Sequence, residues 1–131
     1  MRVTRSSNKM PYFFDTYALF EITNKNENYR QYFEEEIITS TLNLAELFYG
    51  FLKEGKESLI PAWKGKIKKL ISIINADTVT AAVTFKFHNR KKPLSFIDCL
   101  GYCLAKKLDL RFLTGDKEFE GMDNVEFVGK A

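Results

Sequence analysis

The sequence is poor in soft metal ligands and in long apolar runs. It contains one histidine, His88, and two cysteines, Cys99 and Cys103. A zinc site needs about four such ligands, so zinc is disfavoured, and cysteines four residues apart on a predicted helix are expected to stay reduced. No stretch approaches the ~20 consecutive apolar residues that cross a bilayer, and residues 1–10 lack the apolar core of a secretion signal. We therefore expect a cytoplasmic protein without a membrane segment.

Several familiar ligand-binding patterns are also missing. The sequence has no G-x-G-x-x-G segment and no G-x-x-x-x-G-K-[ST] loop, so neither common nucleotide-binding loop is predicted. It has no internal repeat and no low-complexity linker. Its net charge of +3, from 20 Lys and Arg against 17 Asp and Glu, is compatible with a polyanionic partner without establishing one.

The chain has enough apolar surface to form one hydrophobic core. Its 131 residues fit one domain, and 45% of them are hydrophobic. Residues 1–9, MRVTRSSNK, have no apolar periodicity and are rich in small polar side chains. We predict a flexible leader over residues 1–9 and a single domain over residues 10–131.

Short apolar strands alternate with amphipathic helices along the chain. Strands are predicted at 12–14, 36–40, 73–76, 111–114 and 124–128. Helices are predicted after Asp15, at 29–36, 41–55, 58–72 and 79–90, and from Ser95 onward. This alternation is typical of an α/β domain whose mostly parallel sheet is covered by helices on both faces.

Three aspartates stand where these elements begin or end. Asp15 follows the first strand, Asp98 lies early in its helix, and Asp116 follows the strand at 111–114. Asp15 and Asp116 could each be a helix N-cap worth ~1 kcal/mol. Asp98 could stabilise the start of its own helix, because Ser95 to Asp98 has the S-x-x-D spacing of a capping box. Taken one at a time, the three aspartates fit this structural role.

Taken together, the acids indicate a metal site. The carboxyl ends of parallel strands meet at one edge of a sheet, so acids that follow several strands gather there. Neighbouring carboxylates repel one another unless they retain protons or a divalent cation offsets their charge. Oxygen ligands suit Mg²⁺ or Mn²⁺, and such ions promote phosphodiester hydrolysis by activating water and stabilising the leaving oxygen. Glu46 lies away from the apolar stripe of its helix, on the side of Tyr49 and Lys53, and alone it predicts a solvated glutamate.

Four stretches resemble, in the same order, the motifs of the PIN domain family. They are YFFDTYAL at 12–19, NLAEL at 43–47, LSFIDCL at 94–100 and FLTGDKEF at 112–119. The similarity extends from about Met10 to the final predicted strand, and within the family it is greatest to the VapC-like toxins.

The resemblance implies a three-layer α/β/α fold with a mostly parallel five-stranded sheet. It implies a metal-dependent endoribonuclease, the toxin of a type II toxin-antitoxin pair, that cleaves RNA, forms a homodimer and is blocked by an antitoxin protein. The acids carried over by position are Asp15, Glu46, Asp98 and Asp116, which would hold Mg²⁺ or Mn²⁺. Thr16 and Thr114 would support them by hydrogen bonds, and Glu118 would be either a further ligand or a surface residue.

Two other functions fit parts of the sequence. The first is a catalytically silent PIN-like module that binds RNA or protein, which the presence of all four acids disfavours. The second is a phosphatase of the haloacid dehalogenase type, suggested by Asp15 and by Gly115-Asp116. That chemistry needs a second aspartate two positions after the first, where this chain has Tyr17.

Overall fold

The computed structural model describes residues 11–130. The strands are β1 (Tyr12–Phe14), β2 (Ile38–Ser40), β3 (Lys69–Ile71), β4 (Arg111–Thr114) and β5 (Val125–Phe127). The α-helices are α1 (Thr16–Thr23), α2 (Thr41–Lys53), α3 (Ile60–Lys66), α4 (Ala76–His88) and α5 (Phe96–Lys107). Short 3-10 helices are η2 (Glu27–Tyr32), η3 (Glu57–Leu59) and η4 (Lys117–Phe119). The predicted leader at 1–9 lies outside the described residues.

The five strands form one sheet in the order β3-β2-β1-β4-β5, and every neighbouring pair is parallel. The strand order runs outward from β1 in both directions, so β1 is the point where the winding of the sheet reverses. In open parallel sheets, ligands bind beside such a point, at the carboxyl ends of the strands. The fold therefore predicts a ligand-binding site among the residues that follow β1, β2 and β4.

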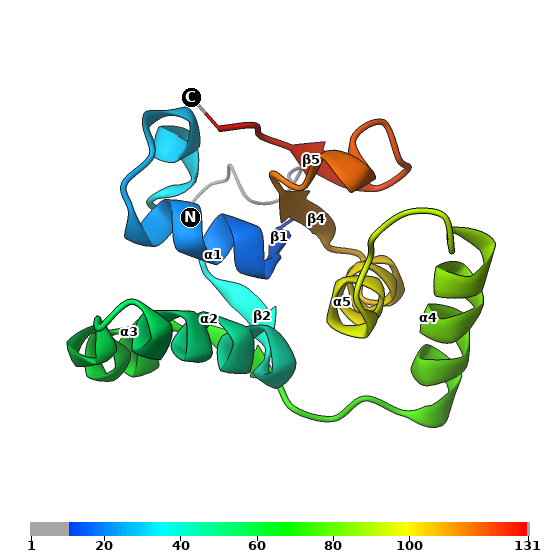
Figure 1. The fold of residues 1–131 in the computed structure, drawn as a ribbon, viewed down its shortest axis with the longest axis horizontal. Helices are drawn as coiled ribbons and strands as arrows, with labels where there is room; N and C mark the ends of the chain where they lie inside the picture. Colours follow the sequence, from blue (N-terminus) through cyan, green and yellow to red (C-terminus); the bar gives the residue numbers. More distant parts are fainter. Residues whose placement is uncertain (1–10, 131) are drawn as a thin grey trace, which may run out of the picture.

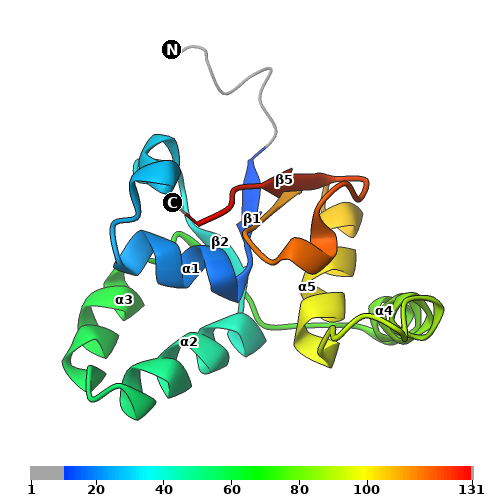
Figure 2. The same ribbon diagram turned by 45° about the horizontal axis from the view of Figure 1, so that its top comes forward.

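Helices cover both faces of the sheet, as Figures 1 and 2 show. Side chains alternate along β1, so Tyr12 and Phe14 pack with α1, α2 and α3, whereas Phe13 packs with α4 and α5. The neighbouring Phe112 and Leu113 of β4 divide in the same way. This arrangement confirms the predicted three-layer α/β/α fold with a parallel five-stranded sheet.

The region between α2 and α4 differs from the sequence-based prediction. The helix predicted at 58–72 ends at Lys66, and Lys69–Ile71 instead forms the edge strand β3. Apolar residues keep a helical spacing through this segment, but pairing with β2 satisfies its backbone, and the Lys68 and Lys69 N–H groups both donate to the Ile37 carbonyl. The strand predicted at 73–76 is wrong, because Asn75 caps α4 by accepting a hydrogen bond from the Thr78 N–H.

The remaining elements agree with the sequence in kind. The helix predicted at 79–90 is confirmed as α4, which begins three residues earlier than predicted. The segment predicted as a short helix at 29–36 is the 3-10 helix η2. Cys99 and Cys103 are free thiols. Within residues 11–130, no helix combines the length and apolar character that a membrane span requires.

Candidate active site

Asp15 lies at the centre of the site, directly after β1. Its backbone N–H continues the ladder by donating to the Leu113 carbonyl of β4 at 3.0 Å, and the residue is only 2% exposed. The carboxylate oxygen Oδ2 accepts a hydrogen bond of 2.7 Å from the Thr114 hydroxyl, whereas Oδ1 is buried with no hydrogen-bond partner. Asp15 does not use its side chain as an N-cap for α1, so the capping interpretation is wrong for this residue.

The surroundings of Asp15 favour its neutral form. The pKa of this carboxyl is raised from 3.8 to about 8, mainly because the group is buried. The negative charges of Asp98 and Glu46 contribute to this rise, whereas hydrogen bonding to the Thr114 side chain and the Thr16 backbone opposes it. Buried polar atoms are almost always paired in native proteins, so an unpaired carboxylate oxygen calls for an explanation. A cation beside Oδ1 would supply both the missing partner and the missing charge.

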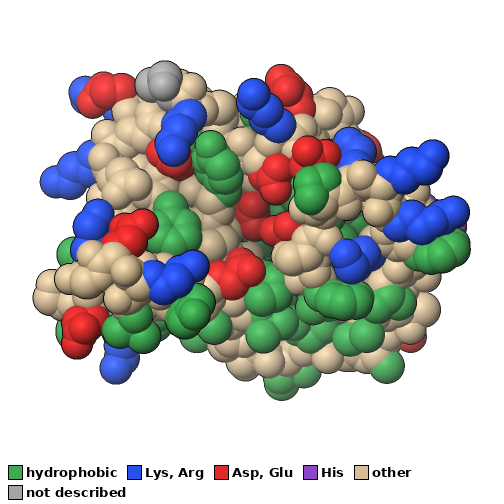
Figure 3. All heavy atoms as spheres, viewed as in Figure 1, with side chains coloured by type: hydrophobic (Ala, Val, Ile, Leu, Met, Phe, Trp, Pro, Cys, Tyr) green, Lys and Arg blue, Asp and Glu red, His purple; other side chains and the backbone are tan. Residues whose placement is uncertain are grey.

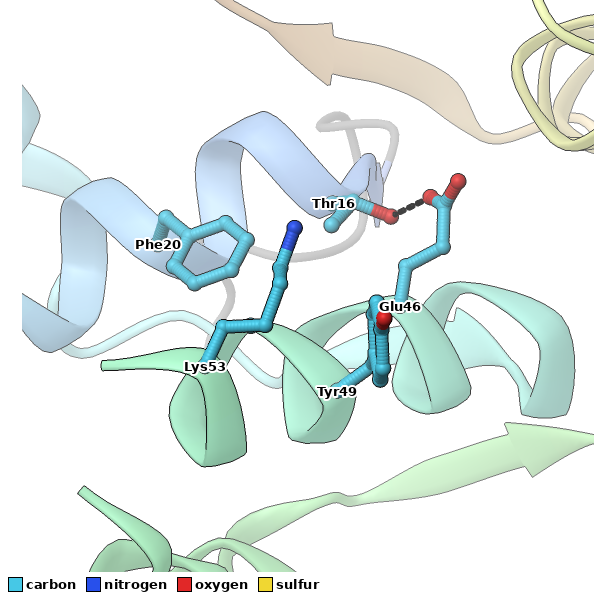
Figure 4. A pocket seen from close by; sticks show the side chains of 6 residues that line it. Thr16, Phe20, Glu46, Tyr49 and Lys53 are labelled. Atoms are coloured by element: carbon cyan, nitrogen blue, oxygen red, sulfur yellow. Dashed lines mark hydrogen bonds between the residues drawn. The ribbon is translucent and has the colours of Figure 1, made fainter. Parts of the chain in front are cut away.

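Glu46 projects from α2 toward the start of α1, where Thr16 forms a hydrogen bond with it (Figure 4). Its Oε1 accepts a hydrogen bond of 2.6 Å from the Thr16 hydroxyl at the start of α1. Thr16 in turn accepts one of 3.0 Å from the Asn43 amide, and Asn43 Oδ1 accepts one of 2.6 Å from the Ser40 hydroxyl. Burial raises the pKa of Glu46, and the charge of Asp98 adds to this effect. Glu46 is therefore half-buried and fixed in place, and it is not the solvated residue that its helix position alone predicts.

Asp98 lies in the first turn of α5, where it forms the capping box that its spacing predicts. Its Oδ2 accepts a hydrogen bond of 2.8 Å from the Ser95 N–H, and its own N–H donates to the Ser95 hydroxyl at 3.0 Å. Burial raises the pKa of Asp98 and the charge of Asp116 adds to the shift, whereas the bonds from Ser95 and the charge of Lys86 oppose it. The structural role of Asp98 is confirmed, and it does not exclude a second role.

Asp116 follows β4 and caps η4, since its Oδ1 accepts a hydrogen bond of 3.0 Å from the Glu118 N–H. The Asp116 N–H donates to the Thr114 hydroxyl at 3.1 Å, so Thr114 links this segment to Asp15. Gly115 leaves no room for a side chain, because a Cβ atom there would lie 2.3 Å from the Tyr17 ring. The supporting hydrogen bonds predicted for Thr16 and Thr114 are both present.

The four predicted acids therefore meet at one edge of the sheet. Asp98 is their common neighbour: its charge acts on Asp15 and on Glu46, and the charge of Asp116 acts on Asp98. Figure 3 shows acidic side chains gathered at the centre of the face seen in Figure 1, in the region between α1, α2 and α5. The Asn43 amide and the Ser40 hydroxyl belong to the same hydrogen-bond network, a role that no sequence pattern predicted.

The fit of this site to a metal ion has two aspects. Its donors are all oxygens, and the unpaired Oδ1 of Asp15 lies among carboxyls with raised pKa values, which suits a hard divalent cation. Within residues 11–130, however, no three Asp, Glu, His or Cys side chains converge into a ready-made metal site. The hydrogen bonds explain why, because Asp98 and Asp116 turn toward their own helix starts and Glu46 toward Thr16.

Comparison with known proteins identifies a family for this arrangement. The profile of the PIN domain matches residues 12–125, nearly the whole described chain. No curated protein matches the sequence.

Solved structures share the fold at low sequence identity. A toxin-antitoxin complex from Klebsiella pneumoniae superimposes with a TM-score of 0.74 at 19% identity, covering 92% of this chain and 99% of that one. DNA-bound VapBC from Salmonella typhimurium gives 0.67 at 19% identity, with 92% and 98% covered. The sarcin-ricin loop cleaving toxin VapC20 from Mycobacterium tuberculosis gives 0.64 at 17% identity, with 88% and 98% covered. These likenesses agree with the five-stranded architecture.

Proposed function

The chain belongs to the PIN domain family, and on this basis we propose that it is a metal-dependent endoribonuclease, the toxin of a type II toxin-antitoxin pair. One observation carries the proposal: Asp15 is buried at the switch point of the sheet with one carboxylate oxygen unpaired and other acids around it. Such a group destabilises the fold unless it binds something positive. A costly group of this kind fits a functional site better than a structural one.

The four acids would have different roles in binding Mg²⁺ or Mn²⁺. Asp15, Asp98 and Asp116 would hold the metal, and Glu46 would hold it or orient a water molecule. When bound, the metal activates the attacking water and stabilises the charge on the phosphate and the leaving oxygen.

Hydroxyl groups next to the acids fix the orientation of the carboxylates by hydrogen bonds. Thr114 occupies Oδ2 of Asp15 and leaves Oδ1 as its free acceptor. Thr16 fixes one oxygen of Glu46, and Asn43 fixes Thr16. Asp98 and Asp116 would exchange a capping hydrogen bond for a metal contact, which costs roughly 1 kcal/mol each. That cost is small beside the penalty of leaving the buried Asp15 carboxylate uncompensated among its half-buried acidic neighbours.

The partner proposals rest on the neighbouring folds. One neighbour is a toxin-antitoxin complex, and two are VapBC complexes with DNA, from Salmonella typhimurium and Rickettsia felis. By analogy we propose an antitoxin protein that blocks the acidic site, an RNA substrate, a homodimer and a cytoplasmic location.

A second candidate function is a catalytically silent PIN-like module. The observation that favours it is the set of local hydrogen bonds at Asp98 and Asp116, which would serve a purely structural cap equally well. The phosphatase alternative loses its basis, because the family assignment accounts for both Asp15 and the Gly115-Asp116 pair.

An RNA cleavage assay separates the two candidates. The purified protein is incubated with total RNA in Mn²⁺ or Mg²⁺, in excess chelator, and in chelator followed by excess metal. We expect defined cleavage products with metal, none in chelator, and recovery when metal is restored. Cleavage that persists undiminished in chelator, or none under any condition, would count against the nuclease.

A further inference from the structure

An open hollow adjoins the acidic site on the α2 side. It has a volume of about 290 Å³ and is lined by Thr16, Phe20, Glu46, Tyr49, Gly50 and Lys53. Figure 4 shows Tyr49 and Lys53 rising from α2 on the same side as Glu46, with Phe20 of α1 opposite them. Gly50 lets the Phe20 ring pack directly against α2 at the wall of the hollow, because a Cβ atom there would lie 2.3 Å from that ring. Whatever fills this hollow lies directly beside Glu46 and Thr16.

The hollow offers a flat aromatic surface next to a cation. Tyr49 is 62% exposed, and the Lys53 ammonium lies 4.9 Å from the centre of its ring. Single-stranded nucleic acids are held by this combination, in which bases stack on aromatic rings while cations contact the phosphates. The volume of about 290 Å³ lies just below the range of about 300–1,000 Å³ that is typical of ligand pockets, so the hollow suits a ligand no larger than one nucleotide.

A similar pair lies close to Asp98. Phe96, 56% exposed, comes two residues before Asp98, and the Lys86 ammonium lies 5.0 Å from its ring centre. Lys86 also acts electrostatically on Asp98, so it is close to the acidic site. Each pair is thus linked to one of the acids, Tyr49 and Lys53 to Glu46, and Phe96 and Lys86 to Asp98.

We propose that these two pairs hold an RNA strand across the acidic site, with one base stacked on Tyr49, another on Phe96, and Lys53 and Lys86 beside the backbone. This proposal rests on the nuclease function and adds to it the binding mode of the substrate, a single strand with unpaired bases. The acids repel a polyanion, so cations on both flanks are needed to bring a phosphate over them. Paired bases could not reach either ring, because their faces are covered by stacking within the duplex.

The test measures RNA binding without cleavage. A short fluorescent single-stranded RNA of mixed sequence is titrated in chelator with the wild-type protein and with Tyr49→Ala and Phe96→Ala. We expect each substitution to weaken binding by roughly tenfold, because one stacked base is lost. Lys53→Gln should also lower the slope of log K against log salt by about 0.7, the value for one phosphate contact on a single strand, while Tyr49→Ala leaves this slope unchanged.

The chain provides matched controls. Phe87 is 60% exposed with Arg90 stacked 4.3 Å from its ring centre, but its ring packs beside His88 and not against any acid. Lys66 lies 5.3 Å from the ring centre of Trp63 on α3. Phe87→Ala and Lys66→Gln should therefore bind the RNA as the wild type does. The five substituted side chains, Tyr49, Lys53, Lys66, Phe87 and Phe96, are all exposed, so each variant should fold, and thermal melts check this.

The outcomes separate this proposal from the nuclease itself. If the wild type cleaves RNA but Tyr49→Ala and Phe96→Ala bind it normally, the binding mode is overturned and the nuclease stands. If the two variants bind weakly but the wild type cleaves nothing, the binding mode stands without the nuclease. The proposal is overturned if the control variants lose as much RNA affinity as Tyr49→Ala and Phe96→Ala, because binding would then depend on general charge effects. It is also overturned if the wild type binds a duplex of matching sequence as tightly as the single strand, because the two rings would then serve another partner, such as a protein segment.

Discussion

The substitution Asp15→Asn is expected to lower RNA cleavage by at least about a hundredfold, because it removes the central carboxylate of the site while conserving its shape. Asparagine keeps an oxygen that can accept the Thr114 hydrogen bond, so β1 and β4 should remain joined at this point. The metal-free variant should also be more stable than the wild type above neutral pH. Together, loss of activity and gain of stability identify a group retained for function at the expense of the fold.

The stability gain follows from the sign of the pKa shift. The pKa of Asp15 is 3.8 when the chain is unfolded and about 8 in the fold, so between these values the folded state holds a proton that the unfolded state has released. The free energy of unfolding of the wild type should therefore fall relative to Asp15→Asn as the pH rises from about 4 to 8, by up to about 1.4 kcal/mol per pH unit. Above pH 8 the difference should level off.

Denaturant unfolding of both proteins in chelator, at a series of pH values, measures this difference. Glu21→Gln is the matched control, because Glu21 is a buried acid of α1 that accepts a 2.7 Å hydrogen bond from Asn26, and glutamine can accept the same bond. This control should cleave RNA as the wild type does. Full cleavage by Asp15→Asn, or a stability difference that does not change with pH, would contradict the role assigned to Asp15.

The second large effect is expected at Asp98, where the capping and catalytic roles can be separated. Asp98→Asn should lower cleavage by at least about a hundredfold with little loss of stability, because an asparagine oxygen can still accept the Ser95 N–H. Ser95→Ala removes the other half of the capping box and should destabilise the fold by roughly 1 kcal/mol, while cleavage survives. The two substitutions should thus have opposite effects on stability and activity.

Thermal melts and initial cleavage rates of Asp98→Asn and Ser95→Ala, measured side by side, provide the comparison. If Asp98 is only a cap, Asp98→Asn cleaves RNA at the wild-type rate. A loss of activity in Ser95→Ala equal to that in Asp98→Asn would mean that cleavage depends on the capping geometry and not on the Asp98 charge.

The sequence predicted most of the fold because its buried strands are short and distinct. The strands at 12–14 and 111–114 lie in the middle of the sheet and contain consecutive buried apolar residues, which identify them in the sequence. The edge strand β3 could not be found in this way, because Lys69 and Leu70 are exposed and the surrounding apolar residues follow a helical spacing. Only the free edge of β2, a tertiary feature, selects the extended form there.

The sequence predicted which acids lie near one another, but not how their side chains are held. The topology of a parallel sheet explains why Asp15 and Asp116 share an edge, and the resemblance supplied Glu46 and Asp98. Sequence spacing correctly predicted the capping box at Ser95. It could not show that Asp15 has an unpaired oxygen or that Asn43 fixes Thr16, because both depend on contacts between residues far apart in the chain.

The most direct measurement of the central claim is a calorimetric titration of Mn²⁺ into the metal-free wild type and into Asp15→Asn at pH 8. If the unpaired Asp15 carboxylate and its neighbours hold a hard dication, the wild type binds Mn²⁺ and Asp15→Asn shows no detectable binding. Equal binding by both proteins, or none by the wild type, would contradict this account.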